Sequence, residues 1–354
     1  MIVLGIESSC DETAAAVVRN GHDVLSNVIS SQMALHAGYG GVIPELAARE
    51  HLRNISPVVQ EALAAAQLTI ADISAIAVTS SPGLIPALLV GNAYAKGLAA
   101  AQGIPLIGIN HFLAHIYGSF LGQPEILADR SSYPILALVV SGGHTAIVLI
   151  EADGSARILG STLDDAAGEA LDKAAKILGL GYPGGPVIDR IAKTGNPQAY
   201  AFPRGLTGAG GKAVKPEHRY DFSFSGVKTA LLYAVKDKTL DEASLADAVA
   251  SYQEAVMEVL VSKAMTAASD FATPLICCCG GVACNSRLRV LMTEETARLG
   301  RRLLAAPPKF CTDNAAMVAG LGWHYLRKGL VDDLAMGVEA RLNRSLGVLP
   351  FAIG

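Results

Sequence analysis

The sequence has few aromatic and few charged residues. Of its 354 residues, aromatics make up 5%, with a single Trp, and Asp, Glu, Lys and Arg together make up 17%. Hydrophobic residues make up 51%, so that Ala, Val, Ile and Leu must fill the cores. This composition excludes an intrinsically disordered chain, and the length indicates about two domains.

The sequence also lacks a long hydrophobic run and a leader-like start. The first six residues form an apolar segment with no basic region before it, which predicts a strand rather than a signal peptide. The longest apolar run, residues 134–150, is interrupted by a polar turn and is too short to span a bilayer. We therefore expect a cytoplasmic protein that does not associate with membranes.

No cysteine spacing indicates a disulfide framework. Cys277, Cys278 and Cys279 are adjacent in an apolar run, and neighbouring side chains of a strand point to opposite faces. Cys279 and Cys284 lack a second pair at zinc spacing. We expect reduced thiols that pack as small hydrophobic side chains.

The net charge of −4 gives no general basic character, so any contact with nucleic acid needs local basic patches. Two stretches of chain are candidates for such patches, and each is equally consistent with ordinary surface charge. The candidates are Arg204, Lys212, Lys215, His218 and Arg219 in a Gly-rich stretch, and Arg298, Arg301 and Arg302.

One pattern of predicted elements occurs twice. Three apolar segments joined by a polar turn and a Gly-containing turn are followed by helical material in both cases. The first set of expected strands covers residues 2–6, 13–18 and 24–29, and the second set covers 135–140, 145–150 and 156–159. Further along, helices are expected at residues 44–65, at 86–101 and from Asp164, as N-cap, to about Leu178. The repeat predicts a duplicated α/β domain.

We expect an N-terminal lobe of residues 1–125, a C-terminal lobe of residues 126–320, and a segment 321–354 that packs back on the first lobe. A molecule of this kind places a cleft between its lobes. The polar turn of each lobe, residues 7–12 and residues 141–145, can then direct backbone N–H groups toward a phosphate. The alternative for both turns is an ordinary hairpin connection.

The junction at residues 280–285 follows an apolar strand and precedes a helix. A strand, a Gly pair and a helix in this order are typical of nucleotide sites. Asn285 would contact a base or sugar there, or it would only cap the helix.

Four acidic residues decorate the helix expected after Asp164, among them Glu169 and Asp172. Each of these two has a lysine four residues later, Lys173 and Lys176, so that a solvated face with ion pairs is the default interpretation.

His111 and His115 are four residues apart directly after an expected strand. On a helix both imidazoles face the same way and can share a metal ion. The zinc protease motif requires Glu after the first His, and here that position is Phe112. Asp313, at another loop–helix junction, is a candidate to complete the site.

These motifs together resemble the bacterial TsaD family of tRNA N6-adenosine threonylcarbamoyltransferases, and the resemblance covers nearly the whole chain. The motifs are GIESSCDET at residues 5–13, His111 and His115, LVVSGGHT at 138–145, DDAAGEA at 164–170, YPGGP at 182–186, FSFSGVKT at 222–229, GGV at 280–282 and CTDN at 311–314.

The resemblance implies an α/β, two-lobed, actin-like and sugar-kinase-like fold with a duplicated core and an interlobe cleft. It also implies that His111, His115 and Asp313 hold one divalent metal ion per subunit, with iron expected and zinc as the alternative. The implied contacts to the adenylate substrate include Asp172, against the default above. The full set of these contacts is Val139, Val140, Ser141, Gly142, Gly143, Asp172, Gly185, Asp189 and Asn285.

The implied reaction transfers the threonylcarbamoyl group of threonylcarbamoyl-adenylate to N6 of adenosine 37 in tRNAs that read codons beginning with adenine, and it releases AMP. The implied protein partners are TsaB and the ATPase TsaE. Asp11 or Glu12 is a candidate to accept the proton of the attacking amine. The sequence departs from the family pattern at Asn110, where a further His is usual, and the role of the long stretch 205–218 stays open.

Three other functions compete with this one. A metalloprotease lacks its base at Phe112. A sugar or acetate kinase of the same fold would have a different acidic first turn and no use for the His pair. A non-catalytic partner subunit would not be expected to keep all three candidate metal ligands.

Overall fold

A computed structural model of the chain describes residues 1–208, 213–341 and 345–351, which form two compact α/β units. Unit 1 comprises Met1–Arg130, Ala152–Ser155 and Lys309–Gly354, and unit 2 comprises Ser131–Glu151 and Ala156–Pro308. The lobe boundaries expected from the sequence are 1–125, 126–320 and 321–354. They differ in detail from this division into units and stay a prediction.

Unit 1 is built on a mixed sheet with the strand order β3-β2-β1-β4-β5. Strands β1, β2 and β3 form an antiparallel meander, and β4 and β5 continue the sheet in parallel with β1. The strands are β1 Ile2–Glu7, β2 Glu12–Arg19, β3 Asp23–Ser31, β4 Ala75–Ser81 and β5 Leu106–Asn110. The helices are α1 Met33–Ala37, α2 Pro44–Ala65, α3 Ile85–Gln102, α4 His111–Gly118, α5 Pro124–Ala128 and α12 Ala315–Arg327, and a short strand β11 covers Ser345–Val348.

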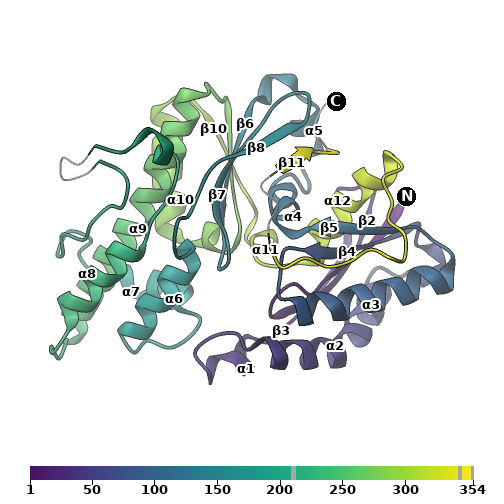
Figure 1. The fold of residues 1–354 in the computed structure, drawn as a ribbon, viewed down its shortest axis with the longest axis horizontal. Helices are drawn as coiled ribbons and strands as arrows, with labels where there is room; N and C mark the ends of the chain where they lie inside the picture. Colours follow the sequence, from purple (N-terminus) through teal and green to yellow (C-terminus); the bar gives the residue numbers. More distant parts are fainter. Residues whose placement is uncertain (209–212, 342–344, 352–354) are drawn as a thin grey trace. The chain divides into compact units, whose positions relative to one another are not determined.

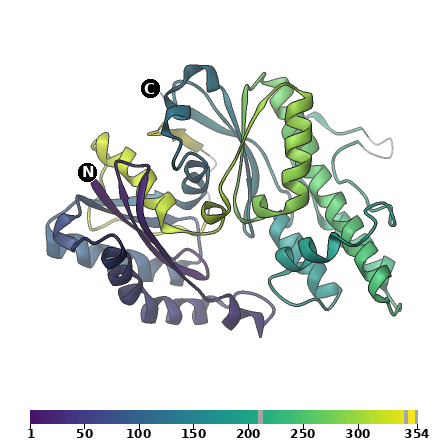
Figure 2. The ribbon, with the colours of Figure 1, turned by 180° about the vertical axis from the view of Figure 1, so that it is seen from behind.

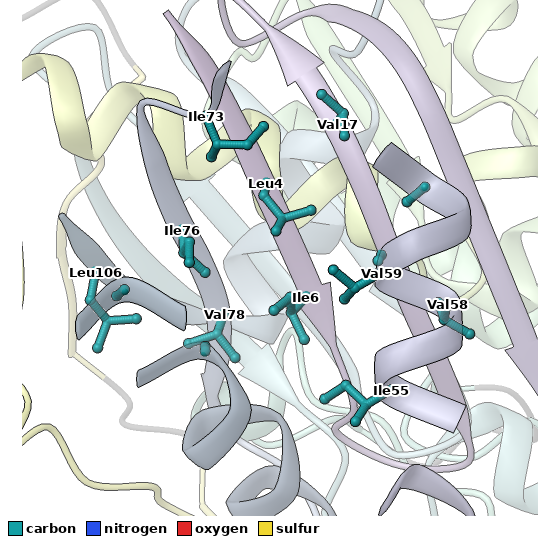
Figure 3. Close-up of a cluster of buried hydrophobic side chains, with 14 residues drawn as sticks. Leu4, Ile6, Val17, Ile55, Val58, Val59, Ile73, Ile76, Val78 and Leu106 are labelled. Atoms are coloured by element: carbon teal, nitrogen blue, oxygen red, sulfur yellow. The ribbon is translucent and has the colours of Figure 1, made fainter. Parts of the chain in front are cut away.

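Helices cover both faces of this sheet (Figure 1). Alternate residues of β1 point to opposite faces, so that Leu4 and Ile6 pack against α2 and α3 in a core of aliphatic side chains (Figure 3). On the other face α12 comes so near that a Cβ at Gly5 would lie 2.8 Å from the Cβ of Ala319. The absence of a side chain at Gly5 therefore allows the helix to approach the sheet.

Unit 2 repeats the same connectivity with the strand order β10-β9-β6-β7-β8. Strands β6, β7 and β8 are antiparallel, and β9 and β10 run parallel to β6. The strands are β6 Ile135–Val140, β7 Thr145–Ile150, β8 Ser155–Ser161, β9 Leu275–Cys279 and β10 Arg302–Ala305. The helices are α6 Ala167–Ile177, α7 Gly184–Ala192, α8 Ser225–Val235, α9 Glu242–Asp270 and α10 Ser286–Arg298. The short helix α11, Pro308–Cys311, begins at the last residue of unit 2 and continues into unit 1. Helices α9 and α10 lie side by side (Figure 2). Because the two sheets share one strand connectivity, the predicted duplication of the α/β core is confirmed.

The expected start of α6 at Asp164 is wrong. The helix begins at Ala167, and its N-cap position is Ala166. Asp164 instead accepts hydrogen bonds from the Ser223 hydroxyl (2.6 Å) and the Phe224 N–H (2.7 Å). A segment about sixty residues away thus takes the oxygens that a cap would have used.

Other sequence expectations concern cysteines, basic residues and membrane helices. All six cysteines are free, and Cys277, Cys278 and Cys279 are buried as expected. Lys212 lies outside the described residues, as do residues 209–211. No helix in the described part of the chain has both the length and the apolarity needed to cross a membrane. Among the other basic candidates, Arg204 forms an ion pair with Glu258, Arg219 with Asp270 and Arg298 with Glu295, and His218 Nδ1 lies 2.9 Å from Asp221 Oδ2.

Candidate active site

Three candidate metal ligands converge in unit 1. Helix α4 starts directly after β5, where Asn110 caps it by accepting a hydrogen bond from the Leu113 N–H. One helical turn then brings the imidazoles of His111 and His115 to a centroid distance of 4.6 Å. The carboxylate Oδ1 of Asp313 lies 3.4 Å from His111 Nε2 and 3.1 Å from His115 Nε2. One ligand atom from each residue falls within 4.8 Å of the others, so the set can hold a metal ion.

Burial and charge fit this arrangement to a cation. His111 and His115 are 6% and 1% exposed. Burial alone would raise the pKa of Asp313, but the two imidazoles outweigh it and hold the pKa well below the usual range. Burial would likewise lower the pKa of His111, but the charges of Asp313 and Glu7 outweigh it and raise that pKa well above the usual value. The site thus sets the His111 imidazole between two carboxylates, an arrangement that favours a cation, and a divalent ion bound there would compete with the proton of His111.

Glu7, to which the sequence assigned no individual role, belongs to this site. Its side chain is fully buried, and Oε2 lies 2.9 Å from His111 Nδ1. Oε2 also accepts the Thr79 hydroxyl at 2.6 Å, and Oε1 accepts the Ser9 N–H at 2.5 Å. Burial would raise the pKa of Glu7, but His111 outweighs it and the pKa is lowered. A carboxylate at the last position of an otherwise apolar buried strand was the signal available in the sequence.

Asp11 and Glu12 lie in the turn after β1, and both are partly exposed. Burial within this acidic turn, helped by the charges of Asp313 and Asp11, raises the pKa of Glu12 to about 9. Glu12 also accepts a hydrogen bond of 3.3 Å from the Ser31 hydroxyl. Without a cation nearby, Glu12 therefore carries its proton at neutral pH.

The polar turn of unit 2 presents its backbone rather than its side chains. Val139 and Val140, at the end of β6, are fully buried, so any ligand contact there has to use main-chain atoms. Gly142 and Gly143 are exposed and have open space where a Cβ would stand. The Ser141 hydroxyl accepts the His144 N–H at 3.0 Å and closes the turn.

Helix α6 is packed directly on this turn. The Gly168 N–H donates to the Ser141 carbonyl at 3.2 Å, and a Cβ at Gly168 would lie 2.8 Å from the Gly142 Cα. The junction after β9 approaches from another side, because a Cβ at Gly280 would lie 2.3 Å from the Val140 carbonyl oxygen. Two glycines thus let two other segments reach the backbone of the turn.

Asp172 and Asp189 connect α6, α7 and α10. Asp172 Oδ1 accepts the N–H of Gly184 at 2.7 Å, at the start of α7 next to Gly185. Asp189 Oδ1 accepts the N–H and the hydroxyl of Ser286 at 3.1 and 2.7 Å, at the start of α10. The default interpretation of the acidic helix is confirmed for Glu169, which pairs with Lys173 at 2.9 Å.

Asn285 caps α10, as its alternative interpretation predicted. Its Oδ1 accepts the N–H groups of Arg287 and Leu288, both at 3.0 Å, and its Nδ2 donates to Gln253 Oε1 at 2.7 Å. The side chain is 6% exposed. All nine predicted substrate contacts lie in unit 2, where hydrogen bonds tie Asp172, Asp189 and Asn285 to the starts of α7 and α10. Their contact with a substrate stays a prediction.

The duplicated core defines the class of protein. The structure is similar to the activator of 2-hydroxyisocaproyl-CoA dehydratase from Clostridium difficile, solved with bound ADPNP, with a TM-score of 0.52 and 15% identity over 93% of this chain and 97% of that one. It is also similar to HypF of T. kodakarensis, with a TM-score of 0.56 and 14% identity over 92% of this chain and 48% of that one. At such low identity these similarities concern the fold alone, which is of the actin-like and sugar-kinase-like α/β type.

The sequence relatives are more specific. The family model described as tRNA N6-adenosine threonylcarbamoyltransferase, TsaD, matches residues 23–320, and the chain belongs to this family. A protein of that name from Trichlorobacter lovleyi is 51% identical over 342 residues, or 96% of each chain. Another from Geobacter sulfurreducens is 50% identical over 350 residues, or 99% of this chain and 98% of the relative.

Proposed function

We propose that this protein transfers the threonylcarbamoyl group of threonylcarbamoyl-adenylate to N6 of adenosine 37 in tRNAs that read codons beginning with adenine, releasing AMP. Membership of the family, with relatives of that name about half identical over nearly the full chain, supports the reaction. The observation that carries it is the convergence of His111, His115 and Asp313 in one buried cluster, because neither a kinase nor a scaffold of this fold requires such a set.

His111, His115 and Asp313 would hold one divalent ion through two imidazole nitrogens and one carboxylate oxygen. Iron is the expected ion, and zinc is the alternative for a set of two nitrogens and one oxygen. When bound, such an ion supplies Lewis acidity and a template for substrate oxygens.

The donor would bind to unit 2 through its AMP part. The exposed Gly142 and Gly143 leave the backbone of the turn accessible to the phosphate. Asp172, Gly185, Asp189 and Asn285 would complete this site. Because Asp189 and Asn285 already cap α10, their part is to hold the start of that helix in place as well as to meet the donor.

The adenylate is a mixed anhydride with a good leaving group, so no covalent enzyme intermediate is required. The protein has to hold the acyl carbon near the weakly nucleophilic amine and stabilise the developing oxyanion. Asp11 or Glu12 would accept the proton of the amine, and Glu12 can do so only when a cation near Asp313 lowers its pKa from about 9.

The proposed partners are TsaB and TsaE, and the proposed compartment is the cytoplasm. The net charge of −4 and the ion pairs of Arg204 and Arg219 weaken the attraction of the first basic candidate stretch for tRNA, so partners would supply part of its binding surface. Helices α2 and α3 offer exposed apolar side chains for a protein contact, namely Leu52, Ile85 and Leu89.

The test uses the purified protein with its partners, threonylcarbamoyl-adenylate and an unmodified tRNA. The digested RNA is analysed for threonylcarbamoyladenosine by mass spectrometry, and a tRNA with guanosine at position 37 is the matched control. We expect the modified nucleoside only with adenosine at that position. Its absence from a protein that binds both metal and AMP would contradict the transferase function.

A further inference from the structure

Glu7 is a buried carboxylate outside the set of candidate ligands. It contacts His111 on Nδ1, the ring nitrogen opposite to the one that faces Asp313. None of the roles described above for metal, donor or proton transfer uses this carboxylate, although burying a charge without a partner is costly.

All groups that meet the Glu7 carboxylate in the described part of the chain can act as donors. The Ser9 N–H is a backbone group and can only donate, and the Thr79 hydroxyl donates to Oε2. The remaining partner, His111 Nδ1, lies 2.9 Å away. An ionised carboxylate only accepts, so a His111 ring that carries a single proton, as a metal-bound ring does, keeps this proton on Nδ1 and presents the lone pair of Nε2.

His115 offers a contrast. Its Nε2 lies 3.1 Å from Asp313, but its buried Nδ1 has no hydrogen-bond partner among the described residues. Histidines that bind metals nearly always donate the other ring N–H to a carboxylate, a carbonyl or water, which fixes the tautomer and the ring orientation. Of the two histidines, His111 alone has a protein group in this role within the described residues.

We propose that Glu7 is a positioning residue that keeps the His111 proton on Nδ1 and turns Nε2 toward the divalent ion. The inference rests on the metal site of the proposed function. The carboxylate of Glu7 would thereby set the metal affinity without touching the metal. It comes from strand β1, 104 residues before His111 in the sequence.

The substitution Glu7→Gln tests this role by reversing one hydrogen bond. The amide oxygen of Gln has to stay on the side of the Ser9 N–H, because that group cannot accept. The amide NH2 then faces Thr79 and His111 Nδ1, which can accept from it. The other contact of Nδ1, the Ser9 hydroxyl at 3.3 Å, can also donate to it, so both neighbours favour an unprotonated Nδ1. The ring proton moves to Nε2, where it blocks the metal.

The matched control is Thr79→Val. It has nearly the same shape and also removes one hydrogen bond from the Glu7 carboxylate, but it leaves the contact with His111 intact. Thr79→Val therefore measures the effect of a disturbed hydrogen bond at Glu7 while the contact with His111 is kept, whereas the tautomer changes only in Glu7→Gln.

The metal affinity of wild type and both variants is measured by competition of Zn2+ with a chromophoric chelator. We expect Glu7→Gln to bind Zn2+ about 10- to 100-fold more weakly than wild type, and Thr79→Val to lose less than about 10-fold. Equal affinity of wild type and Glu7→Gln would overturn the inference alone. A wild-type protein that binds no divalent ion would contradict the proposed metal site as well.

A second measurement does not depend on the folding of a variant. Long-range 15N–1H spectra of the zinc-loaded wild type, with 15N-labelled histidine, report which ring nitrogen carries the proton. We expect a protonated Nδ1 and a zinc-bound Nε2 for His111. Zinc bound to Nδ1 of His111 would overturn the inference.

Discussion

Asp313 is the ligand candidate that touches both imidazoles, so it offers the sharpest change of a single residue at the metal site. Asp313→Asn keeps the shape and removes the charge. We expect a loss of affinity for Zn2+ or Fe2+ greater than the about 10- to 100-fold that an outer carboxylate costs. Elemental analysis after dialysis against a known free concentration measures it.

The control for this change is Asp23→Asn, which removes an exposed carboxylate of the same unit that pairs with Arg19. It should leave the metal content unchanged. Full metal content in Asp313→Asn would remove Asp313 from the site.

His324 is partly buried outside the candidate site, next to Trp323, the only tryptophan, at a centroid distance of 4.8 Å. Burial, followed by the nearby charges of Arg327 and Lys328, lowers its pKa to about 4. Between pH 6.5 and 4 the folded protein binds fewer protons here than the unfolded chain. The contribution of the neutral His324 to the free energy of unfolding is therefore fully present above pH 6.5 and is lost as the pH falls toward 4.

The substitution His324→Gln should remove this part of the acid sensitivity, because an amide can still donate to the Tyr117 hydroxyl as His324 Nε2 does at 3.0 Å. We expect the drop in unfolding free energy between pH 7 and pH 4.5 to shrink by about 1–3 kcal/mol. Urea unfolding followed by Trp323 fluorescence measures it. An unchanged drop would show that His324 does not titrate in this range.

Single residues also mark where sequence reasoning ended. The spacing of His111 and His115 was sufficient to predict a shared face, because a helix places residues four apart on one side. The position of Glu7 at the end of an apolar strand could have marked it as buried, but nothing near it in the sequence named its partner His111, which lies 104 residues later. Long-range pairing of this kind leaves no local spacing to recognise.

At the scale of elements, the start of α6 is held against the turn of residues 141–143. The substitution Gly168→Ala would place a Cβ 2.8 Å from both the Gly142 Cα and the Ser141 carbonyl oxygen. These are backbone atoms, so the turn has to move. We expect a loss of about 1–3 kcal/mol in stability and weaker binding of AMP, measured by urea unfolding and calorimetry.

Gly226→Ala is the matched control, because Gly226 lies in α8 of the same unit and has nothing within 4 Å of its added Cβ. It should leave AMP binding unchanged and stabilise the helix by up to about 1 kcal/mol. Equal AMP affinity in the two variants would contradict the role of the turn in donor binding.

Asp172 links α6 to the start of α7 through the Gly184 N–H. Asp172→Asn retains an oxygen that can accept this N–H, whereas Asp172→Ala does not. If the carboxylate also meets the donor, both variants should bind AMP more weakly, and only Asp172→Ala should lose the stability of a helix cap, about 1 kcal/mol. Wild-type AMP affinity in Asp172→Asn would limit Asp172 to the cap.

Helices and strands could be predicted from the sequence where the residues that define their ends are close together in the chain. The predicted helix of residues 44–65 agrees with α2, since Pro44 and an amphipathic pattern mark it without outside help. Asp164 failed as an N-cap because Ser223 and Phe224 take its oxygens. Neither helix propensity nor hydrophobic periodicity around Asp164 could reveal that a segment about sixty residues later binds its carboxylate.

At the scale of the whole molecule, two units with the same strand connectivity carry different parts of the proposed reaction. Unit 1 contains the metal candidates and the acidic turn, and unit 2 contains the candidates for donor binding. The repeated order of strand, turn and strand predicted this duplication, although few residues of the two halves are identical. Substitutions in unit 1 should therefore remove the metal site and leave donor binding intact, and substitutions in unit 2 should do the reverse. Transfer should need both sites.

The most direct measurement is the yield of threonylcarbamoyladenosine and AMP in a single-turnover reaction with partners and unmodified tRNA. Wild type, Asp313→Asn and Asp172→Asn are compared, each with bound metal and bound AMP determined beforehand. The account predicts one modified nucleoside per AMP released by wild type and strongly reduced transfer in both variants. In Asp313→Asn the metal is lost, and in Asp172→Asn the donor affinity falls. Wild-type yield of modified nucleoside from Asp313→Asn without metal would contradict the account.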